Sequence, residues 1–198
     1  MGDAFCNQIE VVCCDLWRPY IDVAESVFPQ ASIVVDRFHV VKLLNNVLDK
    51  KRKFLRKENK NEESFKNIKW KLFKNVEKCN KEEILSLNEA IKKDNDLEAL
   101  YLLRNDFNSI YQSSNNSRSF SDEIDKWIVK AEKVKDKYLD KFISTLRKWK
   151  SQIANFANTR ITNAATEGLN NFIRYMKRIS FGIPNFQNMR LRVLATFI

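Results

Sequence analysis

The sequence predicts an α/β fold in which a few parallel strands at the front are followed by a much longer all-α segment. Two short apolar runs, Ile9 with residues 11–14 and residues 33–35, each end next to an aspartate, a pattern typical of buried strands in a parallel sheet. Only three Gly and three Pro occur in 198 residues, which favours long helices over a many-stranded sandwich. We therefore expect the chain to be predominantly helical overall.

The segment between the two predicted strands, residues 17–28, is expected to be a helix. Pro19 stands in its first turn, apolar residues recur at helical spacing as far as Phe28, and Pro29 ends it. A helix that connects two strands of one sheet makes those strands parallel.

A second helix is predicted directly after His39. Apolar residues follow the i, i+3, i+4, i+7 pattern from Val40 to Leu48, and the pattern runs on into the basic residues 50–57. This helix therefore presents a charged outer face.

The pattern stays helical from about residue 60 to 155, apart from a polar break at 112–121. The apolar series from Ile124 to Ile153 predicts one helix of about nine turns. Residues 1–57 are accordingly assigned to a strand-helix-strand-helix core, 58–155 to an all-α insertion and 156–198 to C-terminal core helices. The four tryptophans are expected in the core because they stand among aliphatic residues at helical spacing: Trp17, Trp70, Trp127 and Trp149.

The charge balance predicts a polyanionic partner, with nucleic acid ahead of an acidic membrane. There are 35 Lys and Arg against 25 Asp and Glu, and the pI is about 9.4. Residues 39–81 hold 14 basic and 5 acidic side chains, and residues 168–198 hold five basic and none acidic. Phosphate contacts are expected in these two stretches.

Cysteine and histidine usage excludes several classes of protein. Cys6, Cys13, Cys14 and Cys79 fit no disulfide framework and are interpreted as small buried hydrophobic residues. A single histidine rules out the common zinc clusters. No apolar run approaches the roughly 18 residues of a membrane span, and no signal peptide is evident, so a soluble cytoplasmic protein is expected.

Two aspartates are the first candidates for chemistry. Asp15 and Asp36 each follow a predicted strand. Ligands of open α/β sheets bind outside the carboxyl ends of the parallel strands, and neighbouring strands lie about 4.8 Å apart. Two carboxylates at such a short distance repel each other unless a cation lies between them, so the arrangement favours a divalent metal ion. An aspartate before a helix is equally an ordinary N-cap, and the sequence leaves that alternative open.

Glu167 begins the other informative segment, which is predicted to be a helix running to Ile179. At about 100° per residue, Asn171, Arg174 and Arg178 lie within about 40° of Glu167, opposite an apolar face. Gly168 costs about 1 kcal/mol relative to alanine in a helix, which suggests a close approach to the backbone. The alternative is an ordinary glutamate that stabilises the N-terminal turn.

His39 lies three residues beyond Asp36, and a lone histidine is more often a hydrogen-bonded structural residue than a ligand. It is interpreted as a supporting residue that orients Asp36 or a phosphate.

Four segments taken together resemble transposases of bacterial insertion sequences, in particular the ISL-three group of the DDE superfamily. They are residues 14–20 (CDLWRPY), 28–31 (FPQA), 34–40 (VVDRFHV) and 167–171 (EGLNN). The resemblance covers the front and the last forty or so residues well, whereas the helical middle matches only in character.

The resemblance implies a ribonuclease-H-like core, here partial, interrupted by the helical insertion. It implies two Mg²⁺ or Mn²⁺ ions held by two aspartates and a glutamate, with Asp15 as the second acid and Glu167 as the third. Asp36 is a further possible metal ligand, and His39 and Asn171 are supporting residues. The activity implied is DNA cleavage and strand transfer by two-metal phosphoryl transfer.

The implied partner is double-stranded DNA, both transposon ends and target, bound by a homo-oligomer associated with the nucleoid and not with a membrane. The expected DNA contacts are basic residues of the two positive stretches: Lys50, Lys51, Arg52, Lys53, Arg174, Lys177 and Arg178.

The family's first catalytic aspartate has no counterpart in this sequence, because Asp3 lacks a preceding strand. We therefore expect a truncated polypeptide that is inactive alone. Two alternatives stay open: a non-catalytic nucleic-acid-binding protein derived from a transposase, and a helical partner-binding module.

Overall fold

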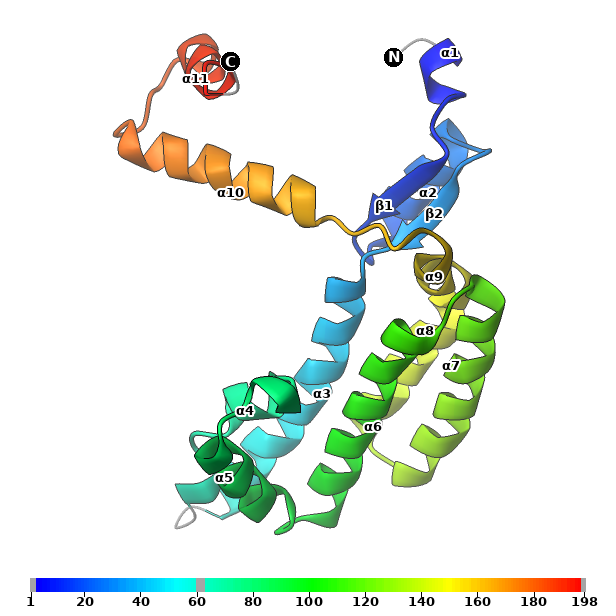
Figure 1. Ribbon diagram of the computed structural model, residues 1–198, viewed down its shortest axis with the longest axis vertical. Coiled ribbons are helices and arrows are strands. Elements are labelled where there is room, and N and C mark those ends of the chain that lie inside the picture. The colour runs from blue at the N-terminus through cyan, green and yellow to red at the C-terminus, as the bar shows by residue number, and fades with distance from the viewer. Residues whose placement is uncertain (1–2, 60–62, 197–198) are drawn as a thin grey trace. The chain divides into compact units, whose positions relative to one another are not determined.

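The computed structural model describes residues 3–59 and 63–196, and Figure 1 shows the course of the chain. The front of the chain forms α1 (Asp3–Cys6), β1 (Val11–Cys14), α2 (Arg18–Val27), β2 (Ser32–Val35) and α3 (Arg37–Glu58). The middle forms η1 (Glu63–Phe65), α4 (Lys69–Phe73), η2 (Val76–Lys78), α5 (Lys81–Ile91), α6 (Asn95–Ser113), α7 (Ser117–Ala131), η3 (Glu132–Val134) and α8 (Lys137–Ala154). The end forms α9 (Phe156–Thr159), α10 (Ala164–Ile179) and α11 (Phe186–Leu194).

The chain divides into two compact units, residues 1–161 and 162–198. Unit 1 contains the sheet and all helices up to α9, whereas unit 2 contains α10 and α11. Among the described residues, no helix is both long enough and apolar enough to cross a membrane.

The predicted strand-helix-strand unit is confirmed. β1 and β2 pair in parallel, with Val11 opposite Ser32 and Cys14 opposite Val35. The crossover helix α2 carries a proline in its first turn and buries Ile21 and Ala24.

The predicted helix after His39 is also confirmed, as the 22-residue α3. Asp36 caps α3, and the buried face of α3 packs against α6 and α8. α3 begins directly after β2 and continues into the helical bundle, so it connects the sheet to the bundle (Figure 1).

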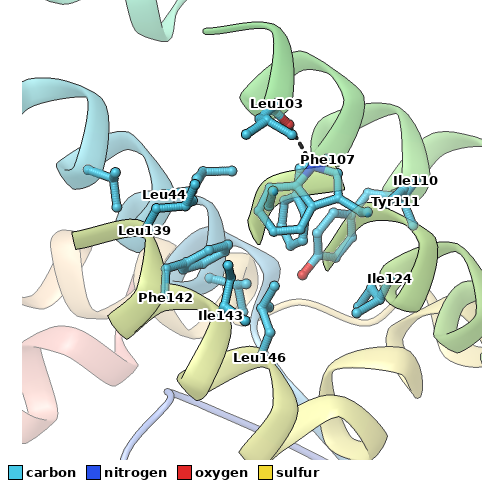
Figure 2. Packing of buried hydrophobic residues seen from close by; sticks show 14 of the residues in the cluster. Leu44, Leu103, Phe107, Ile110, Tyr111, Ile124, Leu139, Phe142, Ile143 and Leu146 are labelled. Atoms are coloured by element: carbon cyan, nitrogen blue, oxygen red, sulfur yellow. Dashed lines mark hydrogen bonds between the residues drawn. The ribbon is translucent and has the colours of Figure 1, made fainter. Parts of the chain in front are cut away.

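The core of the bundle lies where α3, α6, α7 and α8 meet (Figure 2). Its aromatic rings pack edge to face: the Phe107 centroid lies 5.1 Å from that of Trp127 and 5.4 Å from that of Phe142. The Trp127 indole N–H donates to the Leu103 carbonyl at 2.8 Å, so its polar group is satisfied in the core.

The prediction that all four tryptophans lie in the core is half right. Trp127 and Trp149 are buried, but Trp17 and Trp70 are 54% and 72% exposed. Trp17 precedes α2 and packs edge-on against Tyr20 instead. Trp70 lies on the five-residue α4, which buries only Leu72.

The single long helix predicted from Ile124 to Ile153 is wrong. The chain forms α7 and α8 with a turn between them, where Lys135 adopts a left-handed conformation with φ 48°. The Asp136 carboxylate then caps α8 by accepting from the Tyr138 and Leu139 amides. The helical spacing of apolar residues continues through the break because both helices pack on one core. The sequence pattern therefore gave no sign of the turn.

The class predicted from the sequence is confirmed at the level of a predominantly helical protein with a small parallel sheet. The two-stranded sheet is the only sheet in the described residues. The ribonuclease-H-like core and the division at residues 57 and 155 remain predictions, and the sheet and the helical bundle share one compact unit.

Candidate metal centre

The two strand ends bring Asp15 and Asp36 to one edge of the sheet. Cys14 and Val35 are register partners, and each aspartate is the next residue along its strand. The Asp36 amide donates to the Cys14 carbonyl at 2.9 Å, which extends the ladder to the candidate site. The parallel register therefore aligns the two acids, as the sequence predicted.

Asp36 is nearly completely buried, with 2% of its surface exposed. Its Oδ1 accepts from the Phe38 amide at 3.1 Å, so the N-cap alternative left open by the sequence is correct. One carboxylate has more acceptor positions than this single bond uses. The cap therefore does not exclude a role as a ligand.

His39 lies on the first turn of α3 and turns back toward the other strand end. Its Nε2 lies 3.1 Å from Asp15 Oδ1. The capped turn at Asp36 holds the imidazole here, because the cap fixes the start of the helix. Sequence reasoning assigned His39 to Asp36 or a phosphate and missed its contact with Asp15, although the three-residue spacing from an N-cap was the available signal.

Asp15, Asp36 and His39 each offer one ligand atom, and these atoms lie within 4.8 Å of one another. Ligands at about 2.1 Å from an octahedral ion are about 3 Å apart at adjacent vertices, which matches the contact between His39 and Asp15. Carboxylate oxygens suit Mg²⁺, and an added imidazole nitrogen also suits Mn²⁺ and later transition metals. The donor set therefore fits a divalent cation.

The environment of the neighbouring thiols disfavours their thiolate forms. Burial and the negative charge of Asp36 raise the pKa of Cys13 to about 12, and burial with Asp15 raises the pKa of Cys14. All four cysteines are free; Cys14 is buried as predicted, whereas Cys6, Cys13 and Cys79 are half-buried. The carboxylates of Asp15 and Asp36 and the imidazole of His39 are the candidate metal ligands at this edge.

Glu167 lies in the first turn of α10, in unit 2, and its side chain is exposed. The predicted alignment along the helix is present in part, since Arg174 Nη1 donates to Asn171 Oδ1 at 3.0 Å. Its meeting with Asp15 stays a prediction, as do the roles of Asn171, Lys177 and Arg178.

Two expectations about α10 are not met within the structure. An added Cβ at Gly168 would meet nothing within 4 Å, so none of the described residues approaches this glycine closely. The apolar face is not buried as a whole: Met176 is buried, but Leu169 and Ile179 are 45% and 44% exposed.

The four basic residues predicted to contact DNA on α3 have different environments. Arg52 is buried, donates to the Phe65 carbonyl at 3.0 Å and pairs with Asp49 at 2.7 Å, so a phosphate contact by Arg52 is wrong. The Lys51 ammonium forms ion pairs with Asp94 and Asp96. Lys50 and Lys53 are exposed. The four residues could not all contact DNA, because a helix points four adjacent side chains in different directions around its axis.

Comparison with known proteins agrees with the resemblance seen in the motifs. The family model of DDE transposases of the ISL3 type, described as a transposase, matches residues 1–193. The transposase for insertion sequence element IS1001 of Bordetella parapertussis is 26% identical over 198 residues, covering 96% of this chain and 48% of that protein. The chain thus spans about half the length of this curated relative. No solved structure matches significantly. Because the family model covers nearly the whole sequence, the chain belongs to the ISL3-type DDE transposase family.

Proposed function

We propose that this chain supplies part of the catalytic region of a transposase that cleaves DNA and joins its strands by metal-assisted phosphoryl transfer. The observation that carries the proposal is the cluster of Asp15, Asp36 and His39, whose ligand atoms lie within 4.8 Å of one another at two adjoining strand ends. Membership of the transposase family supports the choice of DNA as the substrate.

In this proposal Asp15 and Glu167 are the principal acids, and Asp36 is an additional ligand. Divalent cations bound there would activate the attacking hydroxyl and stabilise the leaving oxygen. Asp15, Asp36 and His39 each offer one ligand atom within 4.8 Å of the others. His39 Nε2 lies 3.1 Å from Asp15 Oδ1 and would help to orient that carboxylate. Glu167 would complete the site from α10.

The donor geometry gives reason to treat His39 as a ligand or a direct partner of Asp15. The two atoms are already at the separation of adjacent ligands around one ion. The pair needs little rearrangement to accept a cation.

The test uses Asp15→Asn and Glu167→Gln in the transposase polypeptide that contains this sequence. Strand transfer in Mg²⁺ is expected to fall at least about a thousandfold in both variants, because each removes a carboxylate from the metal site. Duplex DNA affinity, measured in parallel by fluorescence anisotropy, is expected to stay the same or to rise, because a negative charge is removed. Unchanged strand transfer in both variants would instead favour a non-catalytic DNA-binding protein.

A further inference from the structure

A groove of about 310 Å³ runs between α3 and α8 in unit 1. Its floor is apolar and includes the buried Val47 and Phe142. Lys50 and Lys53 from α3 and Lys141 from α8 line it and are exposed. Positive groups from two helices therefore face one channel.

The lysines of this groove are only partly neutralised. Lys53 Nζ lies 2.9 Å from Asp49 Oδ2, but Asp49 is also paired with the buried Arg52. Within the described residues, Lys50 and Lys141 have no carboxylate at ion-pair distance. The Lys50 ammonium lies 4.3 Å from the Tyr138 ring centroid, which holds it at the wall of the groove.

The face formed by α6 and α7 is different, because its exposed lysines are paired. Lys126 contacts Glu123 at 2.7 Å, and Lys130 pairs with Asp106. In the described part of the chain, the α3–α8 groove thus holds two exposed lysines without an ion-pair partner, Lys50 and Lys141, whereas the exposed lysines of the α6–α7 face are each paired.

The groove is also aligned with the candidate metal centre. At about 100° per residue, Leu43, Asn46, Lys50 and Lys53 all lie within about 40° of His39 around α3. At a rise of about 1.5 Å per residue, Lys50 lies about 16 Å along the helix from His39. That distance corresponds to about five base pairs of duplex at 3.4 Å each.

We propose that the α3–α8 groove binds the sugar-phosphate backbone of duplex DNA on one side of the metal centre. Lys50 and Lys141 contact phosphates, and the Asn46 amide supplies an uncharged hydrogen-bond donor. The inference rests on the proposed function for its choice of DNA, and it assigns to α8 a role that no sequence motif indicated. Such contacts fix the position of the DNA and carry no base specificity.

The experiment measures binding of a fluorescein-labelled duplex to the 198-residue chain by anisotropy across a range of salt concentrations. The double variant Lys50→Ala/Lys141→Ala is compared with Lys126→Ala/Lys130→Ala, which removes the same charge from the opposite, paired face. The groove variant is expected to bind at least about tenfold more weakly at 100 mM salt, with the slope of log affinity against log salt reduced by about 2. The control variant is expected to keep the wild-type slope.

An unchanged slope in the groove variant, or an equal loss in both variants, overturns the inference. Melting curves by circular dichroism establish that both variants fold. Calorimetric titration with Mn²⁺ separates this result from the proposed function, because the groove variant must keep its metal affinity. If Asp15→Asn alone loses Mn²⁺ binding and the groove variant binds DNA as the wild type does, the catalytic proposal stands and the role of the groove in DNA binding is wrong.

Discussion

Asp36 combines a structural contact with the position of a ligand. Its Oδ1 caps α3 through the Phe38 amide, and the residue also belongs to the cluster with Asp15 and His39. Two substitutions separate these roles. Asn caps a helix about as well as Asp, whereas Ala loses the cap at a cost of about 1 kcal/mol.

Asp36→Asn is therefore expected to unfold in urea within about 0.5 kcal/mol of the wild type while binding Mn²⁺ at least about tenfold more weakly. Asp36→Ala should lose both stability and metal affinity. The double role is wrong if Asp36→Asn binds Mn²⁺ as tightly as the wild-type chain does.

Arg52 is expected to act on stability and not on DNA affinity. It pairs with Asp49 and donates to the Phe65 carbonyl, so Arg52→Ala leaves Asp49 with the exposed Lys53 as its remaining cationic partner and removes the donor to that carbonyl. The expected loss is about 2–3 kcal/mol in the free energy of unfolding, less than for a buried charge left with no partner. The neighbouring variant Lys50→Ala, whose side chain is exposed, should change that free energy by less than about 0.5 kcal/mol. Chemical denaturation of both variants measures the difference.

The same pair predicts a pH dependence. Burial alone would raise the pKa of Asp49, but hydrogen bonds from Lys53 and Arg52 lower it below its usual value. A carboxyl with a lowered folded-state pKa stabilises the fold above about pH 4, and the stabilisation is lost as the pH falls through the lower folded value. Acid unfolding should thus depend less steeply on pH in Arg52→Ala than in the wild type.

At the scale of elements, the turn between α7 and α8 offers a test of backbone strain. Lys135 and Arg160 both have positive φ, 48° and 57°. A left-handed conformation costs a non-glycine residue about 1–2 kcal/mol, so Lys135→Gly is expected to raise the melting temperature by several degrees.

Arg160→Gly should have the opposite sign. Its guanidinium donates to the Tyr111 carbonyl at 2.6 Å and to the Ser114 carbonyl, which ties the end of α9 to the end of α6. Losing these bonds outweighs the relief of strain.

Calorimetry measures the melting temperatures of both variants. A lower melting temperature for Lys135→Gly than for the wild type contradicts the strain assignment.

Elements were predictable where local signals agreed with the tertiary environment. Pro19 and Pro29 located α2 to within one residue at each end. The start of α3 was predicted after His39, but α3 begins at Arg37 because Asp36 caps it. The break at Lys135 was not predictable, because no glycine or proline stands there and the apolar period continues. The contact between His39 and Asp15 depends on two strands and a cap together, so the three-residue spacing from the N-cap residue placed His39 on the first turn of α3 but did not identify Asp15 as its partner.

On the scale of the whole molecule, unit 1 couples the candidate metal centre to a helical bundle. α3 runs from His39 into the bundle core, and Asn155 Nδ2 donates to the Ile33 carbonyl at 2.9 Å, which ties the end of α8 to β2. The sheet is therefore connected to the bundle both by α3 and by contacts between α8 and β2. Unit 2 brings the remaining predicted acid and a basic stretch without acidic side chains between residues 168 and 198.

The pairing of positions 15 and 167 was inferred from motifs, since residues about 150 apart share no local pattern. The central claim is that Glu167 joins Asp15 and Asp36 around one cation.

Calorimetric titration of the chain with Mn²⁺ tests this claim most directly, with Glu167→Gln compared with Glu132→Gln, a surface glutamate paired with Arg147. We expect Glu167→Gln, like Asp15→Asn, to weaken Mn²⁺ binding at least about tenfold, while Glu132→Gln binds as the wild type does. Wild-type Mn²⁺ affinity in Glu167→Gln would contradict the account.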